Sequence, residues 1–146
     1  MTIDDTRATR VVTELVRELR AAIAGEVLAP GDLGYDDARR VWNGIIDRHP
    51  AAIARCTSTA DVQAAVRIAG HHRPPAVTVR GGGHQVAGSA VCDDGLVIDL
   101  SLMRDVTVDP AARTARVHGG ARWADVDRAT QRYGLATTGG EASITG

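Results

Sequence analysis

Apolar residues in the first part of the chain recur with the period of an α-helix. Between Thr6 and Ala24 they are spaced three and four residues apart, as in an amphipathic helix, and Gly25 then provides a typical helix end. The stripe consists of Val11, Val12, Leu15, Val16, Leu19, Ala22 and Ile23. We expect it to pack in the core. Next come a Pro/Gly turn region, 28–35, and a short helix within 36–46.

The middle of the chain changes from strand to helix and back to strand. Apolar runs at 51–56 and 75–80 are strand candidates. The segment between them, 57–72, is a helix candidate with Ser58 or Thr59 as its N-cap. Such a βαβ unit pairs its strands in parallel, and ligands collect at the carboxyl ends of the strands. We therefore predict that the two strands pair with each other and that the second one leads into a binding loop.

Shorter elements follow in the last third of the chain. Strand candidates at 95–101, 104–109 and 114–120 are separated by turn residues, which predicts an antiparallel meander. A helix at 121–134 is closed by Gly134. The predicted fold class is therefore α+β, with a parallel βαβ start followed by antiparallel strands.

Composition narrows the class of protein and of partner. The chain has 146 residues, 44% hydrophobic and 24% charged, as in a globular domain. The net charge of -1, the dispersed basic residues, and only two tryptophans and two tyrosines argue against nucleic-acid binding. No apolar run is long enough for a signal peptide or a membrane span. Cys56 and Cys92 lack a CxxC spacing and are typical of reduced thiols, so we expect a cytoplasmic location.

A glycine-rich loop directly follows the strand candidate at 75–80. Consecutive glycines at 81–83 expose backbone N–H groups in a concave nest that can hold phosphate or pyrophosphate oxygens. A hairpin turn is the alternative, but it needs fewer glycines, so the nest is favoured. Ser89 stands where a P-loop requires lysine, and Val86 stands where a dinucleotide-binding fingerprint requires its third glycine. The loop therefore matches neither common phosphate motif.

His84 is the chemically informative side chain of this loop. A metal site needs further ligands at short spacing, and residues 85–88 supply none, so no metal is expected. A histidine that donates a hydrogen bond to phosphate is the simpler interpretation of the residue by itself.

Taken together, several segments resemble one family. They are "PGDLGYDDARRVWN", "ARCTSTADVQAAVRIAG", "VRGGGHQVAGS", "GLVIDLS", "VHGGARWADV" and "GLATTGGEASITG". Their succession is similar to the FAD-linked oxidases of the vanillyl-alcohol oxidase and berberine-bridge-enzyme type, whose FAD-binding domain is of the p-cresol methylhydroxylase type. The resemblance implies an amino-terminal helix and linker at 1–30 and the amino-terminal portion of that FAD-binding domain at 31–146.

The same resemblance implies a set of site residues. The loop would cradle the FAD pyrophosphate, and His84 would form a covalent bond to the 8α methyl group of the flavin. The implied cofactor-binding residues are Arg80, Gly81, Gly82, Gly83, His84, Gln85, Val86, Gly88, Ser89, Gly139 and Gly140. Members of the family with a second covalent bond carry a cysteine where this chain has Ala142, so a single histidyl bond is implied.

The implied activity is that of an FAD-dependent oxidase. Such an enzyme removes a hydride from a C–H beside an alcohol or amine of a small-molecule substrate and passes the electrons to dioxygen. In the family the chain continues into the residues that carry the catalytic base, so we expect this chain to be an incomplete, inactive amino-terminal part. It would come either from a truncated reading frame or from a split protein whose partner chain supplies the missing half. Two alternatives remain open: a non-catalytic flavin- or nucleotide-binding fragment that needs a partner subunit, and a truncated gene remnant.

Overall fold

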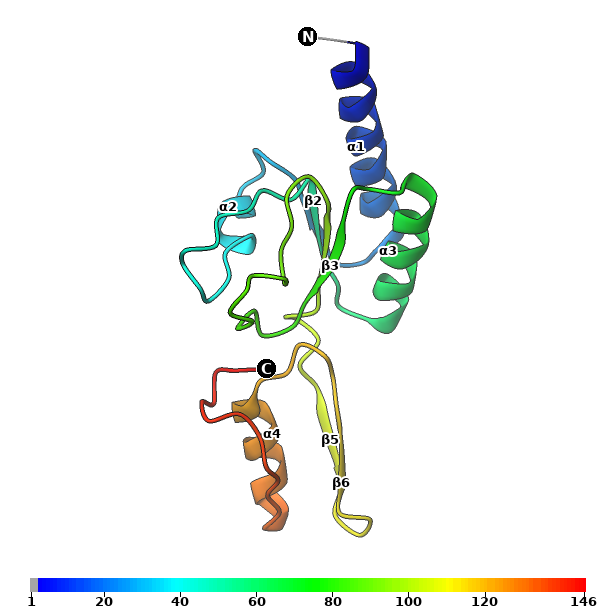
Figure 1. The fold of residues 1–146 in the computed structure, drawn as a ribbon. Helices are drawn as coiled ribbons and strands as arrows, with labels where there is room; N and C mark the ends of the chain where they lie inside the picture. Colours follow the sequence, from blue (N-terminus) through cyan, green and yellow to red (C-terminus); the bar gives the residue numbers. More distant parts are fainter. Residues whose placement is uncertain (1–2) are drawn as a thin grey trace.

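A four-stranded sheet forms the centre of the protein (Figure 1). The computed structural model describes the backbone of residues 3–146 and the side chains of residues 9–146. The strands are β1 (Glu26–Leu28), β2 (Ala52–Arg55), β3 (Val77–Arg80) and β4 (Leu96–Asp99), in the order β1-β2-β4-β3. β4 is parallel to both β2 and β3, and β1 pairs antiparallel with β2.

The position of β4 corrects the predicted strand pairing. β2 and β3 run in the same direction, but β4 lies between them, so the prediction that they pair directly is wrong. All four residues of β4 are buried, as expected of a central strand covered on both faces. Val77 and Val79 of β3 are exposed, which fits an edge strand. The segment at 95–101 is therefore part of the parallel sheet and not of a meander.

Helices cover the two faces of this sheet unequally. α1 (Ile3–Ala22) and α3 (Thr59–His72) pack against each other on one face, and α2 (Tyr35–Ala38) lies on the other (Figure 1). The predicted α1 stripe enters the core through Leu15 and Leu19. Most members of the larger apolar cluster come from α1, α3 and the sheet. They include Val16, Ile23, Val27, Ala52, Ala54, Cys56, Ala64, Ala65, Ile68, Leu96 and Ile98.

Local signals at the ends of these elements are partly confirmed. The Ser58 side chain accepts a hydrogen bond from the Asp61 N–H and so caps α3, as predicted. The buried Tyr35 hydroxyl donates to the Pro50 carbonyl at 2.7 Å, which fixes α2 against the sheet. β1 is not predicted by the sequence pattern, because three residues are too few to display a period.

The last part of the chain forms a ribbon and a helix beyond the carboxyl edge of the sheet (Figure 1). β5 (Val106–Asp109) and β6 (Thr114–Val117) pair antiparallel, as predicted. α4 (Trp123–Thr130) continues into the 3-10 turn η1 (Gln131–Tyr133), and Gly134 closes it at φ 64°. Among the described residues, no helix combines the length and apolar character needed to cross a membrane.

Candidate functional site

The glycine loop starts where the three parallel strands end. The last residues of these strands, Arg55, Asp99 and Arg80, lie side by side in register. The Asp99 side chain is fully buried and accepts hydrogen bonds from Arg80 Nη2 at 2.8 Å and Nε at 3.3 Å. Arg55 Nε lies 3.7 Å from the same carboxylate. Two cations therefore compensate one buried charge directly beneath the loop.

Arg80 connects this buried charge to the far side of the sheet. Its Nη1 donates to the backbone carbonyl of Ala38, the last residue of α2, and to that of Arg40, which follows the helix. The guanidinium is thus used inside the protein. Its observed contacts fix the start of the loop.

Close backbone contacts account for the first two glycines. A Cβ on Gly81 would lie 2.5 Å from the Gly119 carbonyl oxygen, and one on Gly82 would lie 2.7 Å from the Gly146 nitrogen. Gly83 has φ +73°, a left-handed backbone that glycine adopts without strain. The three glycines therefore allow a tight turn that packs against two distant parts of the chain.

The loop leaves its backbone donors unpaired. Among the described residues, no hydrogen bond uses the N–H group of any residue from 81 to 85 as donor. The loop carbonyls, by contrast, are used: Gly83 O accepts from the Trp42 N–H at 3.0 Å, and Arg80 O accepts from the Leu100 N–H at 2.8 Å. Successive free N–H groups of this kind attract anions.

Two hollows flank the loop. The larger, about 750 Å³, opens between the loop and residues 140–146, and seven of the predicted site residues line it. They are Gly81, Gly82, Gly83, His84, Gln85, Ser89 and Gly140. The smaller, about 340 Å³, is lined by Arg80 and also by Trp42, Ser101 and Arg122, which are not among the predicted site residues. The structure therefore gathers most of the predicted residues around one loop.

Three predicted residues lie outside both hollows. Val86 is 68% exposed at the tip of the loop. A Cβ on Gly88 would lie 2.7 Å from the Ile46 side chain, and one on Gly139 would lie 2.4 Å from the Trp123 ring. In this structure those two glycines serve close packing.

The imidazole of His84 is held by two neighbours. Its Nδ1 lies 2.8 Å from the Gly82 carbonyl oxygen. Because a carbonyl only accepts, Nδ1 is the donor, and in the neutral ring the lone pair then lies on Nε2. The ring also stacks on Trp42, with centroids 6.0 Å apart and planes 27° apart. The signal for Trp42 in the sequence is weak: it is one of only two tryptophans in the chain.

Titratable groups near the sheet are perturbed by burial and hydrogen bonding. Burial raises the pKa of the Cys56 thiol to about 11. Burial alone would raise the pKa of Asp61, but hydrogen bonds from the Thr57 and Ala24 N–H groups and from the Thr57 hydroxyl lower it to about 2. Among the described residues, no group of three His, Cys, Asp or Glu is placed to hold a metal ion.

The pattern of the sequence matches one known family. The family model of the FAD binding domain matches residues 50–146. These residues contain the parallel sheet from β2 onward, the glycine loop and the ribbon. The chain belongs to the FAD-binding domain family. As an FAD-binding domain, it has the α+β fold of the p-cresol methylhydroxylase type that the resemblance implied.

Individual relatives agree with this assignment. The (R)-6-hydroxynicotine oxidase of Paenarthrobacter nicotinovorans is 39% identical over 119 residues, which are 82% of this chain and 26% of that protein. The crystal structure of 6-hydroxy-D-nicotine oxidase from Arthrobacter nicotinovorans superimposes with a TM-score of 0.81 at 38% identity, over 85% of this chain and 27% of that one.

A more distant structure shares the same architecture. The carbohydrate oxidase of Microdochium nivale gives a TM-score of 0.79 at 27% identity, over 90% of this chain and 28% of that one. This FAD-binding domain therefore spans about a quarter of the length of the proteins that it matches.

Proposed function

We propose that this chain is the FAD-binding part of an FAD-dependent oxidase, with the cofactor pyrophosphate seated on the glycine loop. The observation that carries the proposal is the run of unpaired N–H groups from 81 to 85. These donors border a hollow of about 750 Å³, so the residues present fit a large, anionic cofactor. In this proposal residues 31–146 form the amino-terminal portion of the domain, and 1–30 form a helix and linker.

The proposed contacts follow the loop in order. Gly81, Gly82 and Gly83 present the backbone to the pyrophosphate, while Gln85, Ser89 and Gly140 line the rest of the hollow. Arg80 does not contact the cofactor in this proposal. Its ion pair with the buried Asp99 fixes the position of Gly81, the first glycine of the loop. Val86, Gly88 and Gly139 shape the loop and its neighbouring segment.

His84 is the proposed attachment point of the flavin. Donation from Nδ1 to the Gly82 carbonyl leaves Nε2 as the nucleophilic nitrogen. Bound FAD would supply a two-electron acceptor, and its 8α carbon could form a bond to this nitrogen. One C–H proton and the imidazole proton would be lost, and the electron pair would pass to dioxygen to give hydrogen peroxide. His84 would then hold the cofactor in place through repeated turnovers.

The proposed reaction is the oxidation of a C–H beside an alcohol or amine by hydride transfer, with dioxygen as the final acceptor. Support comes from the names of two relatives, a hydroxynicotine oxidase and a carbohydrate oxidase. Since the chain spans about a quarter of those proteins, we propose that further residues, on this or a partner chain, supply the substrate contacts and the base. The buried, unpaired Cys56 and Cys92 support a cytoplasmic location.

A flavin-retention assay tests this proposal. The full chain is incubated with FAD under air, precipitated in acid and washed, and the flavin absorbance of the pellet is measured. We expect retained flavin in the parent chain and none in His84→Ala, which still binds FAD noncovalently. The control is His118→Ala, which removes an imidazole that is 40% exposed and distant in sequence. Retained flavin in His84→Ala would move the attachment elsewhere, and loss of all FAD binding in that variant would make His84 a phosphate ligand.

A further inference from the structure

The segment after α2 contacts the glycine loop at several successive positions. Trp42 donates its backbone N–H to the Gly83 carbonyl at 3.0 Å, and its indole stacks on the His84 ring. Asn43 Nδ2 donates to the Val86 carbonyl at 2.8 Å. The contacts therefore bracket His84 on both sides along the chain.

Further bonds within this segment keep it in place. The Asn43 side-chain oxygen accepts from the Ile45 N–H at 3.2 Å, and the Asn43 carbonyl accepts from the Ile46 N–H at 3.0 Å. The Ile46 side chain fills the space that a Cβ on Gly88 would need. The segment is a compact turn, so it can act as a fixed support for the loop.

Exposure of the indole needs an explanation of its own. Trp42 is 62% exposed, although large aromatic side chains usually bury most of their surface. Its indole ring stacks on the His84 ring, and both residues line the smaller hollow beside the loop. The indole thus packs against the imidazole and lines the site, and it is not part of the core.

We propose that Trp42 is a positioning residue for His84. The indole restrains the plane of the imidazole, while the bond from Nδ1 to Gly82 O restrains its rotation. Together they hold Nε2 free and in one direction. The inference rests on the proposed attachment of flavin at His84. It predicts that Trp42 controls the rate of bond formation and not the affinity for FAD, because the phosphate-binding donors belong to the loop backbone.

The first measurement needs no cofactor. In the full chain without FAD, the two carbon-bound ring protons of His84 are assigned by NMR with His84→Ala. We expect ring-current shifts that disappear in Trp42→Ala and persist in Trp42→Phe, which keeps an aromatic face. The control Ile45→Ala truncates a side chain of the same turn that is 89% exposed, and it should leave the shifts unchanged. Shifts that Trp42→Ala does not alter would overturn the stack.

The second measurement follows covalent incorporation of FAD over time. In Trp42→Ala we expect the rate to fall roughly two- to tenfold, the range given by the worth of one aromatic pair, with noncovalent FAD affinity within twofold of the parent. Trp42→Phe should recover most of the rate, and Ile45→Ala should match the parent. Circular dichroism confirms that each variant is folded, and Trp42→Leu, which keeps apolar bulk without an aromatic face, takes the place of Trp42→Ala if that variant is not.

The outcomes separate this inference from the proposed function. If the parent chain forms no covalent flavin, the attachment at His84 fails and the role of Trp42 fails with it. If the parent reacts and Trp42→Ala reacts equally fast, only the positioning role is overturned. A large loss of noncovalent affinity in Trp42→Ala would instead make Trp42 a direct cofactor contact.

Discussion

The sheet region and the ribbon region of this chain differ in how they bury apolar surface. Both apolar clusters of the described residues draw their members from residues 12–103, and none from the ribbon or α4. All four residues of β6 are exposed, whereas all four of β4 are buried. The buried apolar surface of the sheet region therefore contributes most of the free energy of unfolding.

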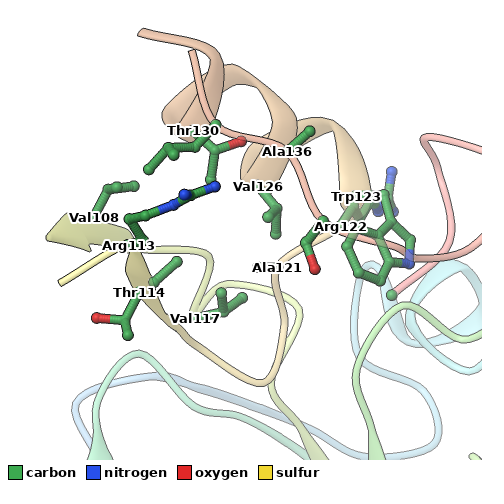
Figure 2. A pocket seen from close by; sticks show the side chains of 14 residues that line it. Val108, Arg113, Thr114, Val117, Ala121, Arg122, Trp123, Val126, Thr130 and Ala136 are labelled. Atoms are coloured by element: carbon green, nitrogen blue, oxygen red, sulfur yellow. The ribbon is translucent and has the colours of Figure 1, made fainter. Parts of the chain in front are cut away.

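The ribbon region instead leaves an apolar hollow between its strands and its helix. Figure 2 shows this hollow, of about 390 Å³, with Val108 and Val117 on the ribbon side and Val126 on the helix side. The glycine loop lies where the two regions meet, since Gly81 touches residue 119 and Gly82 touches residue 146. The sheet region thus holds one side of the glycine loop firmly, and the ribbon region holds the other side loosely.

Truncating one strand side chain in each region should give very different losses of stability. Ile98 in β4 is 1% exposed, and Ile98→Ala should lower the free energy of unfolding by about 2–5 kcal/mol, because the cavity lies in a packed interior. Val117 in β6 is 43% exposed, and Val117→Ala should cost less than about 1 kcal/mol. Urea unfolding followed by circular dichroism measures both. Equal losses would contradict the contrast between the regions.

How far the sequence predicts this contrast depends on the element. Helical periodicity correctly placed α1 and α3, and the Ser58 cap, because those signals are local. The order of the strands is decided by packing between distant segments, so the insertion of β4 between β2 and β3 could not be read from spacing. The continuous apolar run Leu96–Ile98 was the available signal, since central parallel strands are apolar on both faces.

The site shows the same division. The glycine pattern placed the loop at the carboxyl edge of the sheet, and the structure has it there. The individual uses of Gly81 and Gly88 depend on what lies opposite them, which no spacing reveals. Trp42 likewise comes to His84 from 42 positions earlier in the chain, through contacts that only the fold creates.

The two regions should also differ in how their stability depends on pH. The folded pKa of Asp61 is about 2, against an ordinary 3.8. A lowered folded pKa means that the stabilisation is fully present above about pH 4 and is lost as the pH falls toward 2. Asp61→Asn should therefore cost roughly 2 kcal/mol at pH 6 and clearly less at pH 2.5. Thermal unfolding at the two pH values measures the difference.

Its control lies in the ribbon region. Asp105 has a side chain that is 90% exposed, and Asp105→Asn should change the free energy of unfolding by less than about 0.5 kcal/mol at either pH. If Asp61→Asn cost the same at both pH values, the hydrogen bonds to the Asp61 carboxylate would not be the source of its stabilisation.

Gly82 lies at the seam between the regions, where the glycine loop meets residues 119 and 146, and a substitution there should change stability little. Gly82 is outside the left-handed backbone region, so alanine there meets no backbone strain. Its Cβ would instead lie 2.7 Å from the Gly146 nitrogen, and the loosely held segment must shift. Gly82→Ala should cost no more than about 1 kcal/mol of stability, because few apolar contacts are lost.

FAD binding should respond to the same change far more strongly. A shift at Gly82 moves the free N–H groups of the loop, and each charge-assisted hydrogen bond that is lost weakens binding by roughly tenfold or more. Titration with FAD, followed by quenching of flavin fluorescence, measures this affinity beside the unfolding curve. Gly44→Ala is the matched control, since nothing lies within 4 Å of a Cβ at that position. Full affinity in Gly82→Ala would mean that the loop backbone does not seat the cofactor. Weak FAD binding by Gly82→Ala with near-parental stability would instead place the anion-binding site at the seam. There the sheet anchors the glycine loop, and the loosely packed ribbon region sets its position.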